Sequence, residues 1–243
     1  MKGITTTTYG DAIADFYDEL HAIPADDAVA TIAELAGPNG KVLELGVGTG
    51  RVAIPLAARG LAVVGVDVAE SMLAKMRAKP GAERVRVVVG DFSETIAGSD
   101  FSAAFVAFNT FFALTTQDAQ KKCFANVARQ LARGGTFALE CFVPDAARFA
   151  SGQALRTGRI AVDRVVLEAT RYDRNAQTLD AQLVVIDTRG TRLVPLHLRW
   201  AYPSELDLMA ELAGLRLRAR HASWAKSPFS NESATHVSIY EKL

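Results

Sequence analysis

The stretch VLELGVGTGRVAIPLA, residues 42–57, has the composition of a ligand-binding turn. Three glycines, Gly46, Gly48 and Gly50, lie between two apolar runs. Glycine lets a ligand approach the backbone closely, and the first turn of a helix carries N–H groups that lack intrahelical acceptors. A strand that ends in such a turn therefore presents hydrogen-bond donors to a phosphate or to a nucleotide-like ligand.

The spacing within this turn argues against two common nucleotide sites. A phosphate-binding P-loop has lysine followed by serine or threonine after its last glycine, whereas Gly50 is followed by Arg51 and Val52. The dinucleotide fingerprint is G-x-G-x-x-G, and this chain has G-x-G-x-G. A nicotinamide-dependent oxidoreductase is an alternative class, but the chain also lacks a Tyr-x-x-x-Lys pair.

Two acidic residues follow the glycine turn, each at the end of a later apolar segment. Asp67 lies near the end of LAVVGVDV, where a carboxylate can accept both hydroxyls of a ribose. Asp91 and Phe92 follow the next segment, where a carboxylate can read an adenine edge and a ring can cover its face. The glycines and the two aspartates each have a purely structural alternative. The glycines can serve only the turn, and an aspartate can cap a helix or a turn.

Glu140 stands in the otherwise apolar stretch TFALECF, where a buried carboxylate is costly without a partner. It is a candidate general base or acceptor anchor, and the alternative is a paired structural charge. Arg199, beside Trp200, faces either a pocket or solvent. The two histidines His197 and His236 are interpreted as structural.

Composition excludes several classes of partner. Lysine plus arginine equals aspartate plus glutamate at 27 each, so no strong field gathers nucleic acid. The two cysteines fit no metal spacing, which favours free thiols in a reducing compartment and no bound metal. The N-terminus lacks a signal peptide's apolar core, and no apolar run is long enough to span a membrane. We therefore expect a cytoplasmic protein.

The elements that must position these residues alternate along the first part of the chain. Helical spacing predicts helices over 10–21 and 25–37, the second ended by Gly37-Pro38. Strands separated by helices then predict a mostly parallel sheet covered on both faces. The expected strands are 41–45, 61–68, 84–91, 102–109 and 136–143, and the expected helices are 51–60, 70–81 and 116–135.

The pattern changes after residue 150. Polar and apolar residues alternate over 159–174, 177–190 and 191–203, which predicts an antiparallel meander with one solvent-exposed face. A helix follows over 204–215, with Ser204 as its N-cap, and then two strands over 215–224 and 235–242. We expect three regions: a cofactor-binding core with N-terminal cap helices, an inserted antiparallel layer, and a return to the core sheet, over residues 1–150, 151–201 and 202–243 respectively.

The chain resembles the class I S-adenosylmethionine-dependent methyltransferases of small-molecule type. The resemblance rests on four motifs: residues 44–51, Asp67, Gly90-Asp91-Phe92 and RQLARGGTFALE at 129–140. It implies an α/β fold, a Rossmann-like seven-stranded, mostly parallel sheet whose last strand is antiparallel, with the inserted β layer roofing the active site. It implies S-adenosylmethionine as the cofactor and S-adenosylhomocysteine as the product, with no metal.

The resemblance also implies residue roles. The glycines would line the methionine part of the cofactor, Asp67 would hold the ribose hydroxyls, and Asp91 would meet the adenine amine. Met72 or Phe92 would pack on the adenine ring, although Met72 is equally a core residue. The expected cofactor-binding residues are Tyr17, Glu44, Gly46, Gly48, Gly50, Arg51, Asp67, Val68, Met72, Asp91, Phe92 and Asn109.

The methyl acceptor is expected to be a small molecule. The Asn/Asp-Pro-Pro-aromatic motif of adenine and glutamine methyltransferases is absent, since the chain reads Asn109-Thr110-Phe111-Phe112. The antiparallel layer and the N-terminal YGDAIADFYDELH look like those of small-molecule N-methyltransferases. Amino-sugar relatives have a histidine where this chain has Ala113, which argues against an amino sugar. The expected acceptor residues, each with core packing as its alternative, are Tyr9, Phe111, Phe112, Phe142, Arg199, Trp200 and Tyr202.

We therefore predict a monomeric or homodimeric enzyme that transfers a methyl group to a nitrogen, carbon or oxygen of a small molecule. Aromatic walls would suit an aromatic or heterocyclic natural product. The expected catalytic residues are Glu140 and Tyr17, and the transfer itself is an in-line displacement that depends mostly on alignment. The alternative is a protein that binds S-adenosylmethionine or S-adenosylhomocysteine without transferring methyl.

Overall fold

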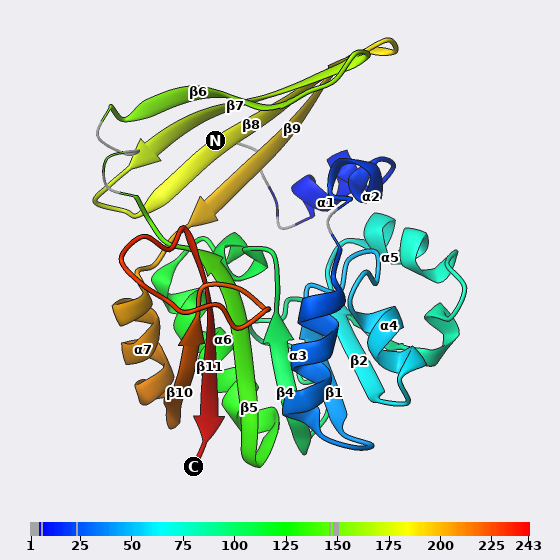
Figure 1. The fold of residues 1–243 in the computed structure, drawn as a ribbon, viewed down its shortest axis with the longest axis vertical. Helices are drawn as coiled ribbons and strands as arrows, with labels where there is room; N and C mark the ends of the chain where they lie inside the picture. The colour runs from blue at the N-terminus through cyan, green and yellow to red at the C-terminus, as the bar shows by residue number, and fades with distance from the viewer. Residues whose placement is uncertain (1–4, 6, 23, 146, 148–150) are drawn as a thin grey trace.

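The computed structural model describes residues 5, 7–22, 24–145, 147 and 151–243. Two sheets organise it, and they stand at an angle to each other (Figure 1). The larger one, the core sheet, has seven strands among the described residues, in the order β10-β11-β5-β4-β1-β2-β3. The smaller one, the lid sheet, has the order β6-β7-β8-β9 and lies above the carboxyl ends of the parallel strands.

The core sheet is the predicted mostly parallel one. Its strands are β1 Lys41–Leu45, β2 Ala62–Asp67, β3 Arg86–Val89, β4 Phe101–Val106, β5 Leu131–Phe142, β10 Leu215–His221 and β11 Thr235–Lys242. Strand β11 runs antiparallel to both of its neighbours, β5 and β10. The predicted fold class is therefore confirmed, including its antiparallel last strand.

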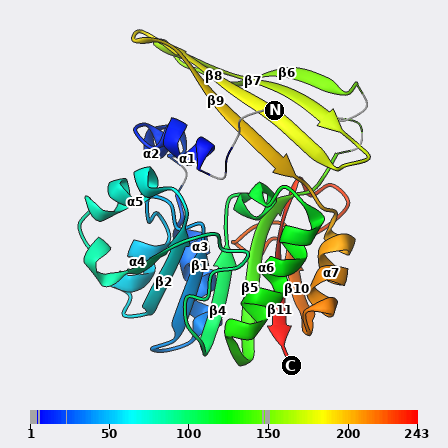
Figure 2. The same ribbon diagram turned by 180° about the vertical axis from the view of Figure 1, so that it is seen from behind.

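Helices cover both faces of the core sheet, because each buried strand is apolar on both sides. Successive residues of β1 show this: Val42 packs into one hydrophobic cluster and Leu43 into the other, and both are fully buried. The covering helices are α3 Asp26–Ala36, α4 Ala53–Ala58, α5 Glu70–Arg77, α6 Gln117–Gln130 and α7 Pro203–Leu212. Figure 2 shows α6 on the face opposite to α3.

The lid sheet is an antiparallel meander of β6 Gln153–Ile160, β7 Arg164–Asp173, β8 Thr178–Asp187 and β9 Gly190–Arg199. One of its faces is apolar: Val166, Val185 and Val194 pack against the N-terminal helices. The sheet is inserted between β5 and α7, so its location depends on packing against the N-terminal helices and the loop after β4.

Four of the differences between the predicted and the observed elements have a clear physical cause. The single helix expected over 10–21 is two short helices, α1 Thr8–Ile13 and α2 Tyr17–Leu20, because the chain turns at 14–16 to bury Phe16 beside Ile13. The strand expected over 159–174 is divided by a turn at 161–163, which makes β6 and β7 a hairpin.

The other two differences lie at helix ends. The helix expected over 116–135 ends at Gln130, since Leu131 is extended and already pairs with Phe101 of β4. Ser204 is not the N-cap of α7: that position belongs to Tyr202, and Pro203 occupies the first helical position, where its missing N–H costs nothing.

Candidate active site

The glycine loop, residues 46–51, connects β1 to the turn before α4. Gly46, Gly48 and Gly50 all have positive φ angles, of 73°, 53° and 76°. A Cβ atom on Gly46 would lie 2.5 Å from Cγ2 of Thr110, which no real contact tolerates. Gly46 therefore needs to be glycine for two reasons, its backbone conformation and the approach of the loop that follows β4.

The glycine loop lines two adjoining cavities. The inner cavity lies between the loop and residues 107–110, and the outer cavity extends from the loop to strand β9 of the lid sheet. Both cavities are lined by Tyr17, Gly46, Gly48 and Thr110, so they are parts of one site. Gly50 lines neither: a Cβ there would meet Met76 and Ile54, so its role is to pack the turn. Its position therefore does not support the predicted contact with the cofactor.

Glu44 is the most informative residue of the inner cavity. Its side chain is buried, and its Oε2 atom has no hydrogen-bond partner in the described part of the chain. Burial, and then the charge of Asp67, raise the pKa of Glu44 well above its usual value. A lone buried carboxylate oxygen costs free energy unless a donor reaches it, so this atom is suited to accept a hydrogen bond from a cationic group of a ligand.

Arg51 lies on the same cavity with the opposite charge. Its guanidinium stacks 3.7 Å from the ring centre of Phe108, and its Nη1 donates to the carbonyl of His21 at 2.6 Å. A carboxylate from Glu44 and a guanidinium from Arg51 in one small cavity match the ammonium and carboxylate of an amino acid. The residues present therefore fit the methionine part of S-adenosylmethionine.

Asp67 ends β2 and lies between the glycine loop and α5. Its Oδ2 accepts the N–H of Gly48 at 2.8 Å, and its Oδ1 accepts the N–H of Ala69 at 2.9 Å. Burial raises the pKa of Asp67 despite these bonds. Each carboxylate oxygen can accept a second hydrogen bond, and Asp67 lines the outer cavity, so it remains available to a ribose diol.

The apolar side of the outer cavity is formed by Val68, Met72 and Phe92, all predicted for the cofactor. Asp91 does not join them. Its side chain is exposed and its Oδ1 accepts the N–H of Ser93 at 2.8 Å, which makes it the cap of the turn after β3. The predicted contact between the Asp91 side chain and adenine is therefore not supported by its position.

Two residues expected near the reacting centre instead support the loop after β4. Glu140 accepts the N–H of Phe108 at 2.8 Å through its Oε2. Asn109, at a φ of 64°, accepts the N–H of Phe142 at 2.6 Å and donates its own N–H to the carbonyl of Glu140. Neither lines the inner or the outer cavity, so the position of Glu140 supports a structural role more than the predicted role of base.

Most of the residues predicted to bind the acceptor are parts of the hydrophobic core. Phe111 and Phe112 are fully buried, Trp200 is buried in the same hydrophobic cluster, and Phe142 packs edge-on against Phe112 with ring centres 4.9 Å apart. None of the four lines either cavity. The spacing of these aromatic residues could not distinguish a pocket wall from a hydrophobic core. In the structure they pack in the core.

Arg199 and Tyr202 also lie away from the cavities. Arg199 faces neither solvent nor a pocket: it is buried and donates to Oε1 of Gln120 at 2.6 Å and to Oε1 of Glu205 at 2.7 Å. Tyr202 is 41% exposed at the start of α7. These bonds tie the base of the lid sheet to α6 and α7.

Tyr9 and Tyr17 are brought together as predicted for the site, and both line the outer cavity. The hydroxyl of Tyr9 lies 3.1 Å from Nε2 of His21. Burial raises the pKa of both phenols above their usual value, so both are neutral at physiological pH. Tyr17 is therefore not an anionic base there, and a hydroxyl that donates and accepts hydrogen bonds is the role its chemistry allows.

A clasp formed by α2 lies across the glycine loop. Oδ1 of Asp18 accepts a hydrogen bond from the hydroxyl of Thr49 at 2.6 Å. Its Oδ2 forms an ion pair with Nζ of Lys79 at 2.6 Å. Arg51 adds the bond to the carbonyl of His21. Helix α2 is thus fixed to the glycine loop by polar contacts at both of its ends.

Sequence reasoning missed one part of the outer cavity. Its lining there comes from the loop after β4, with Thr110, Ala113 and Thr115, and from strand β9, with Pro195, Leu196 and His197. His197 was interpreted as structural. No linear motif marks these residues, and only the pairing of β8 with β9 brings His197 beside Asp180, with His197 Nδ1 2.6 Å from Asp180 Oδ1.

Comparisons with known proteins identify the chain as a methyltransferase. Residues 42–135 match the family described as a methyltransferase domain. The cypemycin N-terminal methyltransferase of a Streptomyces species is 29% identical over 242 residues, 97% of this chain and 98% of that protein.

Among solved structures, the CcbJ methyltransferase of Streptomyces caelestis is 44% identical with a TM-score of 0.92, covering 98% of this chain and 99% of that one. An S-adenosylmethionine-dependent methyltransferase of Clostridium acetobutylicum has a TM-score of 0.80 at 14% identity, covering 96% and 98%. The low identity of the second structure makes it evidence for the fold alone.

The chain belongs to the class I S-adenosylmethionine-dependent methyltransferases of small-molecule type. It is therefore an enzyme that uses S-adenosylmethionine and forms S-adenosylhomocysteine, rather than a binding protein without transfer. No group of three or more metal-ligating side chains gathers among the described residues. In the same part of the chain, every helix is too short or too polar to cross a membrane.

Proposed function

We propose that this enzyme methylates an amine nitrogen of a small natural product, with the lid sheet covering the acceptor. The observation that supports this most is the outer cavity, which begins at the cofactor-binding residues and ends at strand β9. S-adenosylmethionine, when bound, supplies a methyl group activated by a positively charged sulfur. Side chains on the β9 side of the cavity would then lie near the acceptor atom that receives the methyl group.

The chemistry of the cavity favours a nitrogen acceptor. Positive charge develops on an amine as it receives the methyl group, and neutral phenols such as Tyr9 and Tyr17 stabilise it through oxygen lone pairs and ring faces. The aromatic residues that were expected to stack on a flat acceptor lie in the core. An aliphatic amine is therefore favoured. The Streptomyces relative is named as an N-terminal methyltransferase, which also supports an amine.

The test is a screen of wild-type enzyme with S-adenosylmethionine against amines of different shape: a prolinamide, a short peptide with a free α-amine and an aminodeoxy sugar. A catechol and an indole serve as oxygen and carbon comparators. We expect S-adenosylhomocysteine to form, and one amine to gain the mass of a methyl group. Methylation of a comparator with no amine product would overturn the proposal.

We also propose a cytoplasmic enzyme that is a monomer or a homodimer. Both cysteines, Cys123 and Cys141, are free and buried, which suits a reducing compartment. Light scattering on the purified protein gives the oligomeric state.

A further inference from the structure

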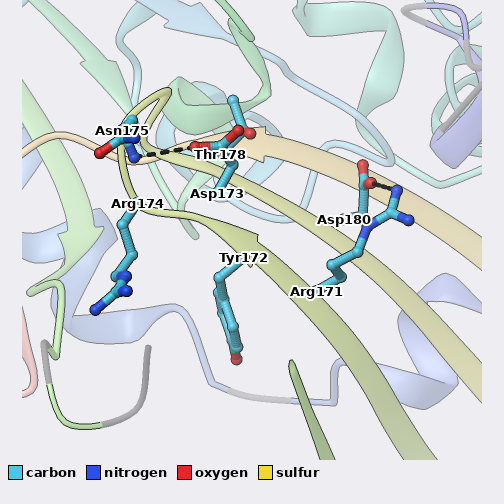
Figure 3. Close-up of a pocket in the computed structure, with 7 residues that line it drawn as sticks. All are labelled: Arg171, Tyr172, Asp173, Arg174, Asn175, Thr178 and Asp180. Carbon is cyan, nitrogen blue, oxygen red and sulfur yellow. Dashed lines mark hydrogen bonds and ion pairs between the residues drawn. The ribbon is translucent and has the colours of Figure 1, made fainter. Parts of the chain in front are cut away.

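A row of polar side chains crosses the lid sheet and ends at the outer cavity. Arg171 of β7, Asp180 of β8 and His197 of β9 are directly opposite one another in the strand register. Figure 3 shows the Arg171–Asp180 ion pair beside a polar depression at the hairpin of β7 and β8. His197, at the other end of the row, lines the outer cavity.

Asp180 divides its two oxygens between its neighbours. Its Oδ2 accepts from Arg171 at 2.6 Å, and its Oδ1 lies 2.6 Å from Nδ1 of His197. Burial acts to raise the pKa of Asp180, but hydrogen bonds from Arg171 and His197, among others, outweigh it and lower the pKa to about 2. Asp180 is therefore ionised at neutral pH and can only accept hydrogen bonds.

This arrangement fixes the tautomer of His197. Because the carboxylate accepts, Nδ1 of His197 must carry the proton, and a neutral ring then has its lone pair on Nε2. Among the described residues, Nε2 of His197 has no hydrogen-bond partner, and the His197 side chain is 28% exposed. An aspartate that orients a histidine and stabilises its cation is a common device for proton transfer.

We propose that His197 accepts the proton of the acceptor amine, with Asp180 as the positioning residue. The inference rests on the proposed amine acceptor, because a protonated amine has no lone pair and cannot attack. The acceptor N–H bond breaks and its proton moves to Nε2 of His197. The freed lone pair then forms the N–C bond to the methyl carbon, while the electrons of the C–S bond remain on sulfur. The imidazolium later loses its proton to water.

The other groups that face this chemistry do not replace it. Among the described residues, the remaining titratable groups that line the outer cavity are Tyr9, Tyr17 and Asp67. Both phenols are neutral, and Asp67 is bonded to two backbone amides beside the glycine loop. Glu140, the base expected from the sequence, bonds the N–H of Phe108 and lines neither cavity.

The first test is kinetic and uses the amine that wild-type enzyme methylates fastest. We expect His197→Gln to lower kcat/KM about 100-fold at neutral pH, within the usual range for a proton-transfer group. The ratio of wild type to variant should shrink as pH rises toward the pKa of the amine, which then loses its proton unaided. S-adenosylmethionine affinity should be unchanged. His221→Gln, on β10 and outside both cavities, is the matched control and should behave as wild type.

The second test does not depend on turnover. Nitrogen-15 NMR of the imidazoles should show His197 as the Nδ1–H tautomer in wild type, and Asp180→Asn should change that tautomer or its exchange. Asp180→Asn should also reproduce part of the kinetic loss.

A wild-type-to-variant ratio that stays constant with pH, or normal turnover by His197→Gln, would overturn the inference while leaving amine methylation intact. A wild-type enzyme that methylates none of the amines would overturn the proposed function and this inference together. An Nε2–H tautomer in wild type would by itself rule out the lone pair that the step needs.

Discussion

The glycine loop and the lid sheet meet at one site, but they form their halves of it with different chemical groups. The loop side is defined by backbone: three positive φ angles, the N–H of Gly48 held by Asp67, and an approach to Thr110 that excludes a Cβ on Gly46. The lid side is defined by side chains on a regular strand, with His197 oriented by Asp180. Substitutions should therefore be tolerated poorly on the first side and alter specificity or rate on the second.

The largest expected effect comes from the backbone side. Gly46→Ala places a methyl group 2.5 Å from Thr110 at a φ of 73°, so we expect S-adenosylmethionine affinity to fall more than about a hundredfold, equivalent to ~2.8 kcal/mol. Calorimetric titration measures it.

Gly60→Ala is the matched control, because Gly60 also has a positive φ, of 88°, but has open space around it. It should lose about 1–2 kcal/mol of stability and no affinity. Equal affinity loss in both variants would mean that backbone strain, and not the approach to Thr110, limits the site.

A comparison of two aspartates tests which part of the motif contacts the cofactor. Asp67→Ala removes an acceptor for the ribose and for the N–H of Gly48, so we expect affinity to fall on the order of 10- to 100-fold. Asp91→Ala should leave affinity unchanged, since Asp91 only caps a turn outside the cavity. The same titration decides, and a larger loss for Asp91 would restore the adenine contact that the sequence predicted.

Glu44 should show a trade between stability and binding. Its pKa is raised above the value of 4.5 of a free side chain, so the penalty for ionising it in the fold is absent below pH 4.5. As pH rises from there, the unfolded chain ionises first, and the folded protein loses stability by up to about 1.4 kcal/mol per pH unit until the folded pKa is passed.

Glu44→Gln should lack this decline, so without cofactor it should be more stable than wild type at neutral pH, yet bind S-adenosylmethionine more weakly. Urea unfolding at a series of pH values measures the first effect. Glu211→Gln, on an exposed face of α7, is the control and should follow wild type. Parallel curves for wild type and Glu44→Gln would show that Glu44 has a partner in solution.

The smallest effect is expected at Glu140. Glu140→Gln keeps an oxygen that can accept the N–H of Phe108, so we expect less than about 1 kcal/mol of lost stability and a wild-type pH profile. Glu140→Ala, which leaves that N–H without its acceptor, should cost about 1–3 kcal/mol. A pH profile altered by Glu140→Gln would return Glu140 to the list of proton-transfer groups.

The two sides also differed in how far sequence could predict them. Gly46, Gly48, Glu44 and Asp67 all lie in or beside one local strand–turn unit, so spacing together with the family resemblance predicted where they lie. Phe111, Phe112 and Trp200 have the same composition whether they wall a pocket or fill a core, and packing decided for the core. His197 gained its neighbour only from strand pairing, which no local pattern encodes. The β6–β7 hairpin was missed because residues 161–163 lack a strong turn signal.

The clasp between α2 and the glycine loop sets a condition on the timing of the catalytic cycle. Tyr17 lines both cavities, and the adjacent Asp18 is bonded to Thr49 and Lys79. We expect S-adenosylhomocysteine to leave the inner cavity only after those bonds open. Segment opening of this kind takes microseconds to milliseconds and often limits turnover in enzymes. A substitution at Asp18 would then alter the residence time of the product rather than the rate of the methyl-transfer step.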